Sequence, residues 1–246
     1  MTYRLTLILP LVIGLAVASG CAGPDTRTSK VADLDPYAGH YPPPVRRPAP
    51  AAPKEQPPPP KTAGRSLKGA TIVVDAGHGG KDPGARGLSS DTEKSINLNI
   101  AMRLTKVLQS RGAKVITTRS TDCFIELDDR AATADRTHAD LFVSIHSDSS
   151  KKAGISGTTV FVSRQASTQS SHAARCIASA LEHAGIECRG VNGAGYRVLT
   201  RHSRPAVLVE CGFLTNRTDA QRLNSAGYQA KIAEAIAEGI AQYFSS

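Results

Sequence analysis

The sequence of 246 residues lacks the basic and aromatic clusters of many nucleic-acid-binding proteins, and it also lacks the long apolar runs of membrane-spanning proteins. It contains no tryptophan, and aromatic residues make up 4% of the chain. No run of lysine and arginine is interleaved with aromatic residues, so we expect no nucleic-acid partner. The longest apolar run, residues 5–17, is shorter than the roughly 20 residues that a helix needs to span a bilayer.

Proline is also scarce outside one segment. Twelve of the 15 prolines lie between Pro24 and Pro60. Such a segment cannot bury a core, and proline favours extended polyproline geometry. We therefore predict that residues 22–66 form a disordered, semi-rigid tether.

The first 21 residues resemble an export signal, with a short basic start, an apolar run and small residues before Cys21. Their end, "ASGC", resembles a bacterial lipobox, although Ala18 stands where leucine is usual. We predict a signal peptide over residues 1–21, a lipid anchor on Cys21 that attaches the protein to a membrane, and an exported, periplasmic protein. The alternative is an ordinary cleaved signal with an incidental cysteine.

Residues 67–246 are long enough for one domain with a sizeable core. Their 22 lysines and arginines exceed their 17 aspartates and glutamates only modestly, which is compatible with an acidic polymer as partner. Patterns rich in valine and isoleucine predict strands over residues 70–76, 113–119, 139–148, 157–163, 196–200 and 205–213. Helical spacing predicts helices over residues 89–112, 126–138, 170–185 and 226–244. The alternation predicts a single α/β domain, with a twisted, mostly parallel sheet and helices on both faces.

Four side chains are expected at one edge of this sheet, where open parallel sheets bind their ligands. His78 follows the first predicted strand, and Glu93 lies in the first turn of the next helix. His146 ends the third predicted strand, and Glu210 ends the last. Two imidazoles and one carboxylate are the ligand set of a catalytic zinc, and a second carboxylate can act as general base. Together they predict metal-assisted amide hydrolysis.

Each of these residues also has an ordinary interpretation. Either histidine could be a simple turn or strand-end residue. Glu93 could form a capping box with Ser90, and Glu210 could pair with Arg204. Only the convergence of all four favours a site.

Four stretches carry a resemblance: "VVDAGHGGKDPGARG", the helix of Glu93, "TRSTDCFIELDDRAATADRTHADLFVSIHSD" and "RPAVLVECGFLTN". In this order they resemble the zinc-dependent N-acetylmuramoyl-L-alanine amidases of the amidase-3 family, from about Thr71 to the C-terminus. The resemblance implies that His78, Glu93 and His146 hold one zinc ion and that Glu210 is the catalytic glutamate. It implies peptidoglycan as the substrate, cut between N-acetylmuramic acid and the L-alanine of the stem peptide.

The sequence departs from the family pattern at Asp148, where asparagine is usual, and at Asn192, where lysine is usual. Both departures bear on substrate preference. Only 63 residues separate His146 from Glu210, too few for the inhibitory helix of some relatives, so we expect a monomer that needs no activator protein. The rival hypotheses are a zinc hydrolase of another cell-wall peptide or amide bond, and a non-catalytic peptidoglycan-binding module.

With Cys21 assigned to lipid, four cysteines remain, and four allow three pairings. Cys176 and Cys188 lie at similar distances on either side of a predicted helix-to-strand turn, which favours a disulfide between them. The alternative is that all four are unpaired. Cys211, next to the catalytic glutamate, is expected to be a buried free thiol.

Overall fold

The computed structural model describes residues 66–88 and 92–246. The predicted signal peptide and all but the last residue of the predicted tether lie outside these ranges. The lipid anchor and the tether therefore stay predictions. Within the described ranges, no helix is both long enough and apolar enough to cross a bilayer.

The described residues form a single six-stranded sheet in the order β2-β1-β3-β6-β4-β5. Neighbouring strands are parallel, except that β4 is antiparallel to β6. The strands are β1 (Thr71–Ala76), β2 (Lys114–Thr117), β3 (Leu141–Asp148), β4 (Thr158–Ser163), β5 (Cys188–Ala194) and β6 (Ala206–Phe213). The predicted α/β domain with a mostly parallel sheet is confirmed.

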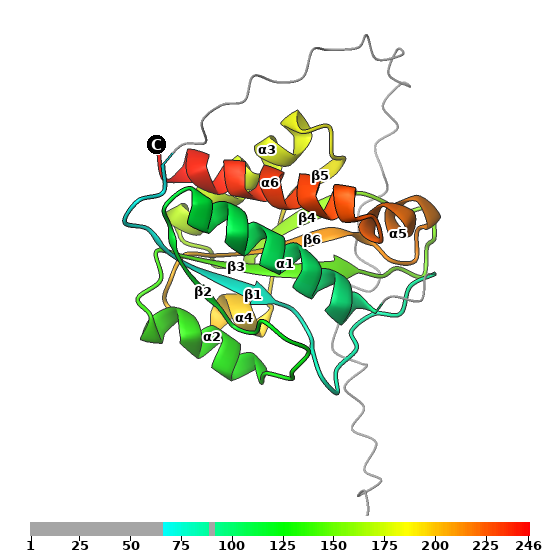
Figure 1. Cartoon of the computed structure of the whole chain (residues 1–246), viewed down its shortest axis with the longest axis horizontal. Coiled ribbons are helices and arrows are strands. Elements are labelled where there is room, and N and C mark those ends of the chain that lie inside the picture. Colours follow the sequence, from blue (N-terminus) through cyan, green and yellow to red (C-terminus); the bar gives the residue numbers. More distant parts are fainter. Residues whose placement is uncertain (1–65, 89–91) are drawn as a thin grey trace, which may run out of the picture. The chain divides into compact units, whose positions relative to one another are not determined.

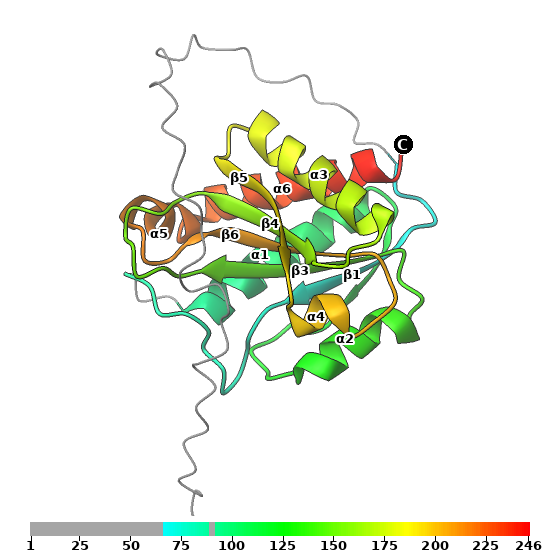
Figure 2. The same ribbon diagram turned by 180° about the vertical axis from the view of Figure 1, so that it is seen from behind.

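Helices cover both faces of this sheet, as predicted (Figures 1 and 2). One face carries α1 (Glu93–Ser110), α3 (Thr168–His183) and α6 (Ala226–Tyr243), which pack against one another and against the strands. The other carries α2 (Leu127–Arg136) and the single turn α4 (Arg197–Thr200), while α5 (Arg217–Leu223) follows β6. The main hydrophobic core lies between the sheet and the first group of helices.

Helix α1 matters most for the site because its first turn lies at the carboxyl edge of the sheet. Thr92, in an extended conformation, precedes the helix, and Glu93 is its first residue. Four apolar side chains recur every four residues and are fully buried, which fixes the rotation of the helix about its axis. They are Ile96, Ile100, Leu104 and Leu108.

Two elements differ from the sequence prediction. Residues 196–200 were predicted as a strand but form α4, and the strand β5 lies earlier, at Cys188–Ala194. β5 contains Gly190 and Gly193, and it is an edge strand that pairs only with β4. Its formation therefore depends on that pairing and not on a local apolar pattern. The short helix α5 was not predicted; the side chain of Asn216 caps it.

The predicted disulfide is wrong, because no disulfide joins any of the four cysteines in the described ranges. Cys176 lies on α3, where its carbonyl is close to Gly239 of α6. Cys188 begins the edge strand β5, in register with Thr158. The prediction used only distances along a helix and a strand, and these do not fix the direction in which a side chain on α3 points. Cys211 is buried, as predicted, and burial raises the pKa of its thiol well above the usual value.

A buried ion pair lies beneath the carboxyl end of β1. Asp75 is 0% and Arg130 is 2% exposed in their side chains, and they contact each other at 2.9 Å. The hydroxyls of Thr118 and Ser144 each donate to the Asp75 carboxylate at 2.6 Å. Burial raises the pKa of Asp75, but Arg130 and these hydrogen bonds outweigh it and hold the pKa below its usual range. The carboxylate is thus a fixed charge of the folded protein.

We predict that Asp75→Ala destabilises the domain by about 3–5 kcal/mol, because it leaves the buried Arg130 guanidinium without its counter-charge. The matched control is Asp128→Ala, which breaks the exposed pair with Arg197. That variant should cost no more than about 1 kcal/mol. Urea unfolding measures the free energy of unfolding of each variant. Equal losses for Asp75→Ala and Asp128→Ala would contradict the stabilising role of the buried ion pair.

Candidate metal centre

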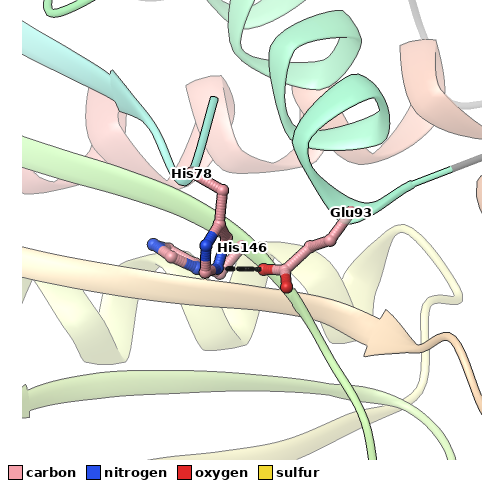
Figure 3. A group of neighbouring side chains, drawn as sticks. All are labelled: His78, Glu93 and His146. Carbon is pink, nitrogen blue, oxygen red and sulfur yellow. Dashed lines mark hydrogen bonds and ion pairs between the residues drawn. The ribbon is translucent and has the colours of Figure 1, made fainter. Parts of the chain in front are cut away.

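The structure brings three of the four predicted site residues together (Figure 3). His78 from the loop after β1, Glu93 from α1 and His146 from β3 have possible ligand atoms within 4.8 Å of one another. Across the described residues, no second cluster of three or more histidine, cysteine or acidic side chains meets this criterion. The parallel topology thus gathers residues that lie far apart in the sequence.

Glu93 lies at the centre of the cluster, with only 4% of its surface exposed. Its Oε1 atom lies 3.1 Å from Nε2 of His78 and 3.0 Å from Nδ1 of His146. Its Oε2 atom accepts a hydrogen bond from the backbone N–H of Ala85 at 2.7 Å. The side chain is therefore directed into the site, and the capping-box interpretation is wrong, because Glu93 is the first residue of the helix and Thr92 is its N-cap.

The electrostatics of the cluster fit a cation. Burial raises the pKa of Glu93, but hydrogen bonds from His146 and His78 outweigh it and hold the pKa well below its usual range. Burial lowers the pKa of His78, but hydrogen bonds and charges of Glu93 and Asp82 outweigh it and raise the pKa to about 9. Without a metal, a proton on His78 balances the buried carboxylate. A metal cation would supply that positive charge in its place.

Asp82 orients His78, and the sequence analysis did not single it out. Its Oδ2 atom lies 2.7 Å from Nδ1 of His78, which leaves Nε2 facing Glu93. A carboxylate on the second ring nitrogen is the usual partner of a metal-binding histidine. The signal was present in "GHGGKD", where the aspartate follows the histidine by four residues.

Two buried arginines fix the backbone that carries His78. Arg130 donates to the carbonyls of Ala76 and His78 at 2.6 and 2.7 Å. Arg119 donates to the carbonyls of Ala76 and Gly77 at 2.8 Å each. His78 has a φ of 58°, a left-handed conformation that is uncommon outside glycine. These hydrogen bonds hold it there.

Glycine is required at two positions where the backbone approaches the side chains of the cluster. A Cβ atom at Gly77 would lie 2.3 Å from the imidazole of His146. At Gly84, which has a φ of +69°, a Cβ atom would lie 2.4 Å from Oε2 of Glu93. Any larger residue would displace the side chain of His146 or of Glu93.

Glu210, the fourth predicted residue, lies beside the cluster. It is buried on β6 and is the register partner of His146 on β3, so the two side chains lie on the same face of the sheet. Its atoms do not belong to the group of ligand atoms within 4.8 Å. Pairing with Arg204 is wrong, because that guanidinium donates to the carbonyls of Ala139 and His138.

The chain between His146 and Glu210 is taken up by the rest of β3 and by β4, α3, β5 and α4. Of its two helices, α3 packs against α6 and the sheet, and α4 packs against α2. Both helices are therefore parts of the layers that cover the sheet.

The chain matches known proteins over most of the described domain. The family Amidase_3, described as N-acetylmuramoyl-L-alanine amidase, matches residues 72–242. YqiI of Bacillus subtilis is 40% identical over 183 residues, which cover 74% of this chain and 88% of YqiI. The N-acetylmuramoyl-L-alanine amidase LytC of the same organism is 36% identical over 178 residues, which cover 72% of this chain but only 36% of LytC.

Solved structures agree with these sequence matches. The catalytic domain of CwlV, an N-acetylmuramoyl-L-alanine amidase from Bacillus (Paenibacillus) polymyxa var. colistinus, superimposes with a TM-score of 0.68 at 35% identity. The superposition covers 72% of this chain and 98% of that domain. With a family match over most of its length and relatives above 30% identity, the chain belongs to the Amidase_3 family of N-acetylmuramoyl-L-alanine amidases.

Proposed function

We propose that this protein hydrolyses peptidoglycan at the amide bond between N-acetylmuramic acid and the L-alanine of the stem peptide. The observation that carries the proposal is the cluster of His78, Glu93 and His146 at the carboxyl edge of the sheet. Family membership supports the choice of bond, since LytC and CwlV bear the name of this activity.

The donor set fits one zinc ion. Two imidazole nitrogens and a carboxylate oxygen are the protein ligands of catalytic zinc, which keeps a further position for water or substrate. The carboxylate is held ionised, and both imidazoles already face it. The chemistry that zinc supplies in such a site is a lowering of the pKa of a water molecule to about 7 and polarisation of the scissile carbonyl.

Glu210 is the proposed general base. Its carboxylate takes a proton from the attacking water and passes it to the nitrogen of the leaving L-alanine. A buried position on β6, in register with His146, holds that carboxylate rigidly beside the metal ligands. Asp82 holds the ring of His78 in orientation throughout.

The setting of the enzyme follows from its substrate, which lies outside the cytoplasm. We propose export through residues 1–21, a lipid anchor on Cys21 and residues 22–66 as the tether that lets the domain reach the wall. No helix between His146 and Glu210 is left outside the helical layers, which supports activity without an activator protein. We also propose that the enzyme acts as a monomer.

We predict that a chelator removes the activity of the purified domain and that added zinc restores it. His78→Ala or His146→Ala should lose both bound zinc and activity, since each removes a ligand. His183→Ala, at the exposed end of α3, is the matched control and should keep both. Zinc content is measured by atomic emission, and full activity of the metal-free protein would contradict the proposal.

Glu210→Gln separates the base from the ligands. The variant should bind about one equivalent of zinc yet lose roughly 10²–10⁴-fold in rate, because the amide cannot accept the proton. Glu182→Gln on the exposed face of α3 serves as the control for the substitution itself. Loss of zinc from Glu210→Gln would show instead that Glu210 is a ligand.

Digestion of purified peptidoglycan identifies the bond. We expect mass spectrometry to find intact stem peptides with a free L-alanine amine, together with glycan strands that lack peptides. Cleavage within the peptides would favour a hydrolase of another cell-wall bond. Binding without any cleavage would favour a non-catalytic module.

A further inference from the structure

A single buried amide connects the segments that carry all three metal-binding side chains. Asn97 lies on α1, four residues after Glu93 and so on the same face of the helix. Asn97 is polar but 0% exposed, and its neighbours in the helix, Ile96 and Ile100, are apolar core residues. A polar side chain at such a position costs free energy unless its hydrogen bonds are made.

The hydrogen bonds of Asn97 all go to the metal-binding segments. Its Nδ2 atom donates to Oε1 of Glu93 at 3.1 Å and to the carbonyl of Gly77, next to His78, at 3.5 Å. Its Oδ1 atom accepts from the hydroxyl of Ser147 at 3.1 Å. Ser147 directly follows His146 in β3.

Ser147 closes the network. It is also 0% exposed, and its backbone N–H donates to Oε1 of Glu93 at 3.2 Å. That oxygen thus lies within hydrogen-bonding distance of one amide, one backbone N–H and the two imidazoles. The amide and the backbone N–H are fixed by α1 and β3, so they set where the oxygen lies relative to the histidines.

We propose that Asn97 is a positioning residue that sets the mutual placement of Glu93, His78 and His146 before the metal binds. The inference rests on the proposed metal site and adds a function for a residue that touches neither metal nor substrate. Removing the amide takes one of four partners from Glu93 Oε1 and leaves the Ser147 hydroxyl without its Asn97 acceptor in a buried site. The carboxylate is then held less firmly in its position relative to the imidazoles.

The test is Asn97→Leu, which keeps a similar volume and removes both hydrogen-bonding groups. We expect the variant to bind zinc about 10–100-fold more weakly than the unchanged protein, the usual effect of losing a partner of a metal ligand. Competition with a chromophoric chelator measures the affinity. The visible absorption of the Co²⁺-loaded protein should also change, because it reports the ligand geometry directly.

A matched control separates positioning from stability. Ile100→Val removes one methylene from the buried face of the same helix and lowers its stability modestly without touching the site. Its zinc affinity and Co²⁺ spectrum should stay unchanged. Thermal unfolding of the metal-free proteins verifies that each variant is folded at the temperature of the titration.

Ser147→Ala tests the same network from β3. It should also weaken zinc binding, and its effect should not add to that of Asn97→Leu, because both act through one set of hydrogen bonds. If Asn97→Leu does not fold, the affinity of Ser147→Ala decides the matter. Unchanged zinc affinity and an unchanged Co²⁺ spectrum in the folded variants would overturn the inference alone. Failure of the unchanged protein to bind zinc would overturn the proposed metal site as well.

Discussion

The carboxylate of Glu93 is buried, with 4% of the residue's surface exposed. Nitrogen atoms of two imidazoles, His78 and His146, lie 3.1 and 3.0 Å from its Oε1 atom. An ionised carboxylate in such a place needs compensating charge and hydrogen bonds, because its desolvation costs several kcal/mol. Asn97 and the backbone N–H groups of Ala85 and Ser147 supply the hydrogen bonds. The compensating positive charge is a proton on His78 or a metal ion.

The fold supplies the rigidity that this arrangement needs. β1 and β3 are adjacent parallel strands, so the residues at their carboxyl ends meet at one edge. The buried arginines Arg119 and Arg130 fix the carbonyls that lead from β1 to His78. Asp75 compensates the charge of Arg130 below the site. Stability and function are therefore coupled at this edge of the sheet.

Much of this could be predicted from the sequence because the signals are local. The valine- and isoleucine-rich strands gave the sheet, and strand ends next to glycines gave the candidate ligands His78 and His146. What the sequence could not give depends on tertiary contacts. The edge strand β5 forms through pairing with β4, and no disulfide joins Cys176 to Cys188, because distances along the chain do not fix the direction of a side chain on α3. The role of Asn97 appears only once α1, β3 and the loop after β1 are placed together, whereas the signal for Asp82 is local, in "GHGGKD".

We propose that one zinc ion lies between His78, Glu93 and His146, with Glu210 beside it as a base and not as a ligand. The most direct measurement is anomalous X-ray diffraction at the zinc absorption edge on crystals of the zinc-loaded domain. We predict a single strong peak within about 2.0–2.2 Å of one atom from each of His78, Glu93 and His146. A peak elsewhere, or one with Glu210 inside that distance, would contradict it.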